Sequence, residues 1–141
     1  MKKIIILIFM MALLPLVAHA QSDFPIAKIV KAGESGSLTA FTRLGFKKGP
    51  TDETSNAVSY CFYKNCTITR QRDIKSFGKG TSLIVFRGWS TSQVDGWLTI
   101  RVFNQTALNT AIRYLRRYKN GVSIDKEDRG WTIVLSFGWL E

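Results

Sequence analysis

The chain has 141 residues, with two cysteines, one histidine, and 20 lysines and arginines against 10 acidic residues, which gives a formal net charge of +10 at pH 7. This length fits one domain with a single core of modest size, and the charge favours an acidic protein surface or a polyanion as partner, unless it serves solubility alone. The only histidine, His19, lies in an N-terminal segment that we expect to be removed, which excludes Ser-His and Cys-His nucleophile pairs and histidine-ligated zinc from the mature protein.

The first 20 residues have the features of a bacterial secretory signal peptide. Lys2 and Lys3 precede an apolar run over residues 4–17, and Ala18-His19-Ala20 forms a small-x-small cleavage site. The run is shorter than the about 20 residues that a membrane-spanning helix needs. We therefore expect cleavage after Ala20, no transmembrane anchor, and a periplasmic or secreted protein made of one domain over residues 21–141. Loss of the two lysines lowers its net charge to +8.

The segment after the signal peptide predicts one helix. Residues 26–31 read as a short strand or extended lead-in, and the glycines and serines of residues 33–37 read as a loop. Leu38, Phe41 and Leu44 recur at helical spacing, and Gly45 would end this helix in the left-handed conformation. Residues 46–56 are polar and rich in turn formers, so they predict no regular element.

Two β-like segments, residues 57–63 and 67–74, are expected to pair with one another, and Cys61 lies within the first of them while Cys66 directly precedes the second. Cys61 and Cys66 would then face each other across a short hairpin. In an exported protein this arrangement predicts a disulfide. A redox-active pair is the alternative, but it usually has Cys-x-x-Cys spacing.

The segments TSLIVFRGWS (81–90) and GWLTIRVF (96–103) predict a second hairpin. Residues two apart in a strand share a face, so placing Trp89 opposite Trp97 assigns the side chains to two faces. The face expected to be core holds Ile84, Phe86, Leu98, Ile100 and Val102. The opposite face holds Leu83, Val85, Arg87, Trp89, Trp97, Thr99, Arg101 and Phe103.

This second face mixes aromatic rings with arginines. Burying Arg87 and Arg101 without partners would be costly, so we expect partial exposure. Tryptophan and arginine are enriched at binding hot spots. We therefore hypothesise that Arg87, Trp89, Trp97 and Arg101 contact a protein partner. The alternative is that one or both tryptophans pack under a helix or under the N-terminal segment.

Residues 104–120 form the strongest predicted helix, with Asn104 or Thr106 as its cap and Gly121 as its end. Its apolar stripe consists of Leu108, Ala111, Ile112, Leu115 and Tyr118. A basic face carries Arg113, Arg116 and Arg117, which could bind a polyanion. The alternative is a solvated face, because cations are favoured near a helix C-terminus.

Residues 122–125 and 131–139 predict a final hairpin. Alternate residues of its second strand are apolar and should face the core: Trp131, Ile133, Leu135, Phe137 and Trp139. Asp125, Glu127 and Asp128 cluster near the turn. Paired catalytic carboxylates need a cleft and a set separation, so we interpret these acids as a solvated turn.

The resulting element order, α-β-β-β-β-α-β-β, predicts a small α+β domain with two helices packed on one face of a largely antiparallel sheet. No phosphate-binding loop, Cys-x-x-Cys set or calcium loop is present, so we expect neither cofactor nor metal. The leading expectation is a non-enzymatic exported protein that binds another protein, such as an inhibitor or an immunity protein against an envelope-acting toxin or enzyme. The alternatives are a binder of lipopolysaccharide or nucleic acid, and a secreted histidine-free enzyme or toxin.

Overall fold

The computed structural model describes residues 24–70, 73–77, 82–90, 95–118 and 121–138. The predicted signal peptide and Trp139 lie outside these ranges. The helices are α2 (Ile26–Ser35), α3 (Leu38–Arg43) and α4 (Gln105–Leu115). The strands are β1 (Lys47–Glu53), β2 (Ala57–Lys64), β3 (Cys66–Arg70), β4 (Asp73–Phe77), β5 (Leu83–Ser90), β6 (Asp95–Val102), β7 (Val122–Lys126) and β8 (Trp131–Gly138).

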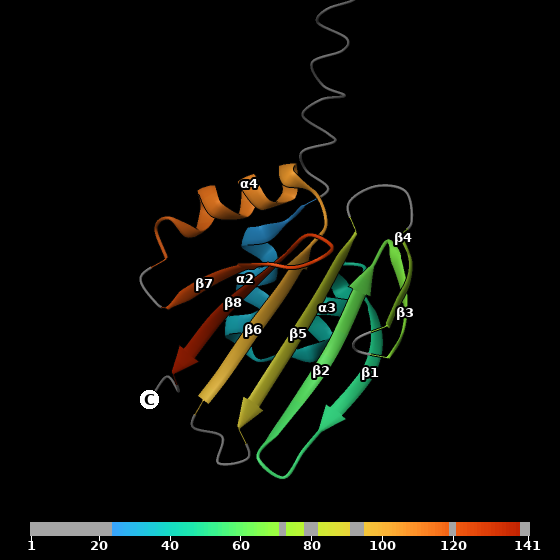
Figure 1. The fold of residues 1–141 in the computed structure, drawn as a ribbon. Coiled ribbons are helices and arrows are strands. Elements are labelled where there is room, and N and C mark those ends of the chain that lie inside the picture. The colour runs from blue at the N-terminus through green and yellow to red at the C-terminus, as the bar shows by residue number, and fades with distance from the viewer. Residues whose placement is uncertain (1–23, 71–72, 78–81, 91–94, 119–120, 139–141) are drawn as a thin grey trace, which may run out of the picture.

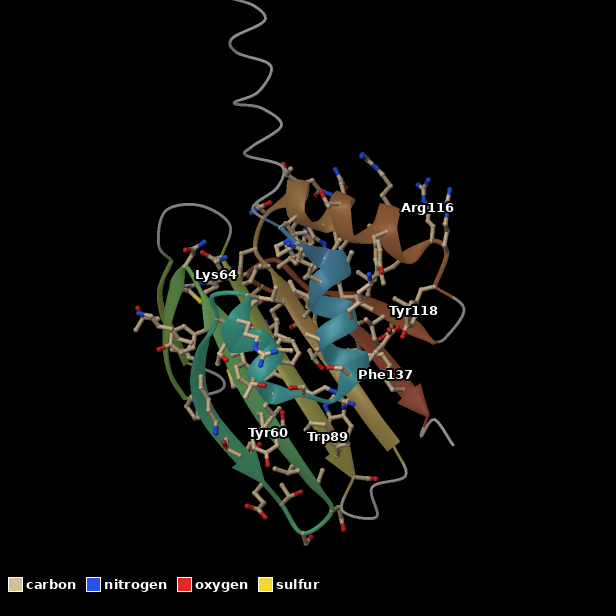
Figure 2. All side chains as sticks on the ribbon, turned by 180° about the vertical axis from the view of Figure 1, so that it is seen from behind. Tyr60, Lys64, Trp89, Arg116, Tyr118 and Phe137 are labelled. Carbon is tan, nitrogen blue, oxygen red and sulfur yellow. The ribbon has the colours of Figure 1, made fainter. Side chains whose placement is uncertain are left out.

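Six strands form one antiparallel sheet in the order β1-β2-β5-β6-β8-β7. β3 and β4 form a separate two-stranded sheet, which lies beside β1 and β2 in Figure 1. Figure 1 views the large sheet from the side opposite α2 and α3, and Figure 2 views it from the helix side. The domain is therefore α+β with a largely antiparallel sheet, as the sequence predicts.

The main core lies between the helices and one face of the sheet. α2 buries one side and packs across β6, where Gly33 permits a close approach because a Cβ there would lie 2.7 Å from Leu98 Cδ2. The helices contribute Ile26, Ile29, Val30, Phe41, Leu108, Ala111 and Leu115 to this core. The sheet contributes Phe62, Leu83, Val85, Leu98, Ile100, Val102, Ile133 and Leu135.

The C-terminal half agrees with the sequence prediction. Asn104 caps α4, since its Oδ1 accepts a hydrogen bond from the Ala107 amide at 2.7 Å. The apolar stripe of α4 faces the core, although the helix ends at Leu115 instead of continuing to residue 120. β7 and β8 form the expected hairpin, with Ile133 and Leu135 fully buried.

The N-terminal half differs from the prediction at two elements. Residues 26–35 form α2 and no strand, and their buried positions follow a helical spacing: Ile26, Ile29, Val30 and Gly33. Residues 47–53 form edge strand β1 where only turns were expected. The register of β1 against β2 shifts between Lys48 and Thr51, and this irregularity accommodates Pro50, which an edge strand tolerates.

The pairing around the cysteines also differs from the prediction. β2 pairs with β1 and β5, whereas the expected second strand is split into β3 and β4, which pair with each other. Asn65, with φ of 58°, turns the chain out of the large sheet between β2 and β3. Cys61 and Cys66 therefore belong to different sheets and do not face each other across a hairpin.

In the part of the chain that the structure describes, none of the helices combines the length and the hydropathy needed to span a bilayer.

Candidate functional site

The register between β5 and β6 decides which side chains share a surface. Gly88 lies opposite Trp97, and Trp89 lies opposite Gly96. The expected pairing of the two tryptophans is therefore wrong by one residue, and such a shift moves a whole strand to the other face. The observed register is favoured because it brings Leu83 and Val85 onto the same buried face as the apolar residues of β6.

Arg87 lies on the helix-covered face and is only 4% exposed, so the expectation that it is part of an exposed binding surface is wrong. Its Nε donates to the Gly33 carbonyl at 2.8 Å, and its Nη1 donates to the carbonyls of Gly88 at 2.6 Å and Trp97 at 3.2 Å. These bonds connect α2, β5 and β6. They explain the burial, because a buried cation is tolerated when hydrogen bonds satisfy it.

Aromatic rings complete the environment of Arg87. Its guanidinium lies 4.1 Å from the centroid of the Trp89 ring and 5.1 Å from that of Phe137. Burial lowers the pKa of Arg87 to about 10, so the group stays charged at neutral pH. Gly96 supplies the necessary space, since a Cβ there would lie 2.7 Å from Nη1. Gly88 and Gly96 each directly precede a tryptophan in the sequence, and this pattern was a signal of room for large side chains beside the strands.

Trp89 also lies on the helix-covered face. Its ring makes an edge-to-face contact with Tyr60 at 5.9 Å, and the two side chains lie together beyond the ends of α2 and α3 in Figure 2. A Cβ at Gly36, which follows α2, would be 3.6 Å from the Trp89 ring. Trp89 is therefore a half-buried residue that packs at the C-terminal end of α2, on the side of the sheet opposite Trp97.

Trp97 and Arg101 lie on the opposite face of the sheet. The Trp97 indole lies directly on Gly88 of β5, where any Cβ would overlap the ring. Arg101 lies over the ring of Phe103, with 5.4 Å between the guanidinium carbon and the centroid. Both side chains are half-buried. Among the described helices none covers this side of the sheet (Figure 1).

Neighbouring positions on three strands extend this surface. Thr99 lies between Phe86 of β5 and Val134 of β8, in the row beside Trp97 and next to Arg101. We call the half-exposed set of Phe86, Trp97, Thr99, Arg101 and Val134 the open sheet face. Phe86 and Val134 were not predicted to belong to it. Placing them there requires the register of β5 and β8 against β6, and the residue types alone do not indicate that register.

The β3–β4 hairpin covers the adjoining part of the same face. Ile68 packs with Cys61 and Ile84, and Tyr63, Cys66, Phe86 and Phe103 surround this small cluster. The hairpin therefore forms one border of the open sheet face.

Both cysteines are thiols within this cluster. Cys61 is fully buried, and its pKa is raised to about 12, mainly by burial and also by the proximity of Cys66. Burial also raises the pKa of Cys66, whose Sγ donates to the Leu83 carbonyl at 3.7 Å. Neither thiol has the depressed pKa of a nucleophilic cysteine. The disulfide stays a prediction.

The basic cluster of α4 lies apart from the open sheet face, whereas Asp125 lies on the same side of the sheet as that face, in one row with Thr132 and Arg101. Arg113, Arg116 and Arg117 are exposed at the end of α4, which packs beside α2 on the helix side, and Figure 2 shows Arg116 pointing away from the domain. Their role as a binding site stays a prediction. Asp125, Glu127 and Asp128 are exposed near the β7–β8 turn. Among the described residues, no three His, Cys, Asp or Glu side chains are grouped to hold a metal ion.

Comparison of the chain with protein-family models, curated proteins and solved structures gave no match.

Proposed function

We propose that this protein is a non-enzymatic exported protein that binds another protein through the open sheet face, as an inhibitor or an immunity protein against an envelope-acting toxin or enzyme. The observation that carries the proposal is the position of Trp97. Its indole lies half-buried on a sheet face that no described helix covers, on the same side of β6 as Arg101 and between strands that contribute further apolar side chains.

The chemistry of the open sheet face suits a protein partner. Gly88 lets the Trp97 ring lie flat on the backbone of β5, so the ring is held in place before a partner binds. A side chain that is already ordered loses little conformational entropy on binding. Phe86 and Val134 add apolar area next to Trp97, while Thr99 and Arg101 add hydrogen-bond donors. Tryptophan and arginine, which this face carries at Trp97 and Arg101, are the residue types enriched at binding hot spots.

The charge of the protein indicates an acidic partner. The net charge of +8 expected for residues 21–141 would accelerate association with a negatively charged surface. Arg101 places one of these positive charges on the open sheet face itself.

The proposal is tested by capture from the periplasmic extract of the source organism, identification of the captured protein, and measurement of its affinity for purified variants. We expect Trp97→Ala and Arg101→Glu each to weaken binding at least about 10-fold, a loss of about 1.4 kcal/mol. Arg43→Glu is the matched control, because Arg43 is an exposed arginine on α3 at the helix side and undergoes the same charge change.

Thermal unfolding of each variant separates a binding defect from a folding defect. One outcome would contradict the proposal. In it, the Trp97→Ala and Arg101→Glu variants melt like the wild type and bind the partner as tightly as the Arg43→Glu control. If Trp97→Ala alone unfolds, Arg101→Glu and Val134→Glu still test the surface, because both residues are half-exposed.

A further inference from the structure

Among the described strands, none pairs with the outer edge of β7. β7 is the last strand of the large sheet, and residues 123–126 are all exposed. Among the described residues, the large hydrophobic side chains left exposed are Tyr114 and Ile124, and Ile124 of β7 is 40% exposed. Such an edge is a ready template for another strand. The opposite edge differs, since β1 contains Pro50 and a register shift and has β3 beside it.

The register of β7 against β8 shows which of its backbone groups point outward. The Ser136 amide donates to the Gly121 carbonyl at 3.3 Å, and the Glu127 amide donates to the Gly130 carbonyl at 3.0 Å. Hydrogen-bonded pairs alternate along an antiparallel ladder, so Ser123 and Asp125 also direct their backbone groups toward β8. The N–H and C=O groups of Val122, Ile124 and Lys126 therefore point away from the sheet.

We infer that this edge pairs with the same edge of a second copy of the chain, antiparallel about a two-fold axis at Ile124. In this register Ile124 lies opposite its own counterpart, and Val122 lies opposite Lys126 of the second copy. Shifting the register by two residues would leave one of the three outward residues without a counterpart. A two-fold interface needs a self-complementary surface, and this strand provides one.

The side chains fit this register on both faces of the extended sheet. On the helix side the two Ile124 side chains would form a cross-strand apolar pair, which buries the most exposed aliphatic group of the described chain. On the other side Ser123 would lie opposite Asp125 of the second copy. No two like charges lie directly opposite one another within the paired strands.

The charges at the two ends of β7 are also complementary. The exposed arginines Arg116 and Arg117 precede β7, whereas Glu127 and Asp128 follow it. Because the two strands run in opposite directions, the chain that follows one β7 lies beside the chain that precedes the other. Extending the register by one residue places Glu127 of the second copy opposite Gly121, four residues after Arg117. The basic end of each α4 would thus meet the acidic turn of the second copy, and this contact occurs twice.

The surface area buried by the strand pairing alone is small. A ladder of five residues buries less than the roughly 1,200 Å² found in stable protein interfaces. We therefore expect a weak dimer that forms at high protein concentration and dissociates on dilution or in high salt.

Sedimentation velocity of the purified protein, at concentrations from about 5 to about 500 µM, tests this inference. We expect the average mass to rise toward twice that of the monomer. Ile124→Lys should abolish the rise, because it places two ammonium groups opposite each other while leaving the β7–β8 hydrogen bonds intact. Ser123→Lys is the matched control on the neighbouring residue. It should retain or strengthen the dimer, since the new lysine would lie opposite Asp125.

A charge exchange tests the orientation of the two strands. The double variant Arg116→Glu, Arg117→Glu and the double variant Glu127→Lys, Asp128→Lys should each dimerise less than the wild type. An equimolar mixture of the two should recover dimerisation, because opposite charges then meet at both ends of the heterodimer. A protein that stays monomeric over the whole concentration range, or a dimer that Ile124→Lys leaves unchanged, would overturn the inference. Circular dichroism of each variant verifies that it is folded.

Discussion

At the scale of single residues, Arg87 and Arg101 show how the same side chain serves two purposes on two faces of one strand pair. Arg87 is buried because three backbone carbonyls accept its hydrogen bonds and two aromatic rings flank its guanidinium. Arg101 remains half-exposed over Phe103. The general rule that arginine avoids the core fails at Arg87, since the planar guanidinium directs several donors to fixed acceptors at once.

This difference predicts different costs for the same substitution. Arg87→Met should lower the free energy of unfolding by about 2–4 kcal/mol, because it removes several charged hydrogen bonds that join α2 to β5 and β6. Arg101→Met should change it by less than about 0.5 kcal/mol, as expected for a surface position. Urea unfolding followed by circular dichroism measures both. Equal effects of the two substitutions would show that the bonds of Arg87 contribute no net stability.

At the scale of elements, the parts that could be predicted from the sequence are those with one clear period. α4 has an apolar stripe and an asparagine cap, and β8 alternates strictly, so both were placed correctly. α2 was missed because its β-branched residues and Gly33 resemble a strand, while its helical form depends on packing against the sheet. β1 was missed because its Gly-Pro pair indicates a turn, although an irregular edge strand tolerates it.

Predicting the candidate site correctly required the register of β5 against β6, which was the least predictable feature of the fold. β5 is apolar on both faces, since Leu83 and Val85 face the helices while Ile84 is buried beneath the β3–β4 hairpin. Alternation therefore does not identify the core face of β5. Trp97 and Arg101 were correctly assigned to one face because they belong to one strand, whereas Arg87 and Trp89 were attached to them by the wrong pairing.

The β3–β4 hairpin gives the reduced protein a specific dependence on pH. Cys61 lies beneath the hairpin, and burial raises its pKa from the ordinary 9.0 of a thiol to about 12 in the folded protein. Between these values the unfolded chain loses the thiol proton while the folded chain keeps it, so stability falls as pH rises. In the presence of a reductant, we expect stability above pH 9 to fall more steeply in the wild type than in Cys61→Ala, by up to about 1.4 kcal/mol per pH unit.

Urea unfolding between pH 8 and pH 10.5 measures this difference. Cys61→Ala removes the titrating group and leaves the other titrating side chains in place, so each protein is compared with its own value at pH 8. Parallel pH profiles of the two proteins would show that the Cys61 thiol titrates alike in the folded and unfolded states.

At the scale of the whole molecule, the open sheet face and the arginines of α4 lie on different sides. The open sheet face carries Trp97 with one arginine, whereas the exposed arginines of α4 lie on the helix side. A polyanion and a protein partner would thus use separate surfaces. Separate surfaces make the two functions independently testable on the same protein.

If lipopolysaccharide or single-stranded nucleic acid is a ligand, exposed cations at the end of α4 should dominate its affinity. Changing Arg113, Arg116 and Arg117 together to Ala should then weaken binding about 10-fold or more, and raising NaCl from about 50 to about 200 mM should weaken the wild type strongly, because binding releases counterions. The matched control changes Lys28, Lys31 and Arg43 to Ala, which removes the same charge from exposed positions on α2 and α3. Fluorescence anisotropy with a labelled oligonucleotide and with labelled lipopolysaccharide measures each affinity. If both triple variants lose the same affinity, only the net charge matters. If the affinity of the wild type does not respond to salt, the α4 arginines are excluded as a polyanion site.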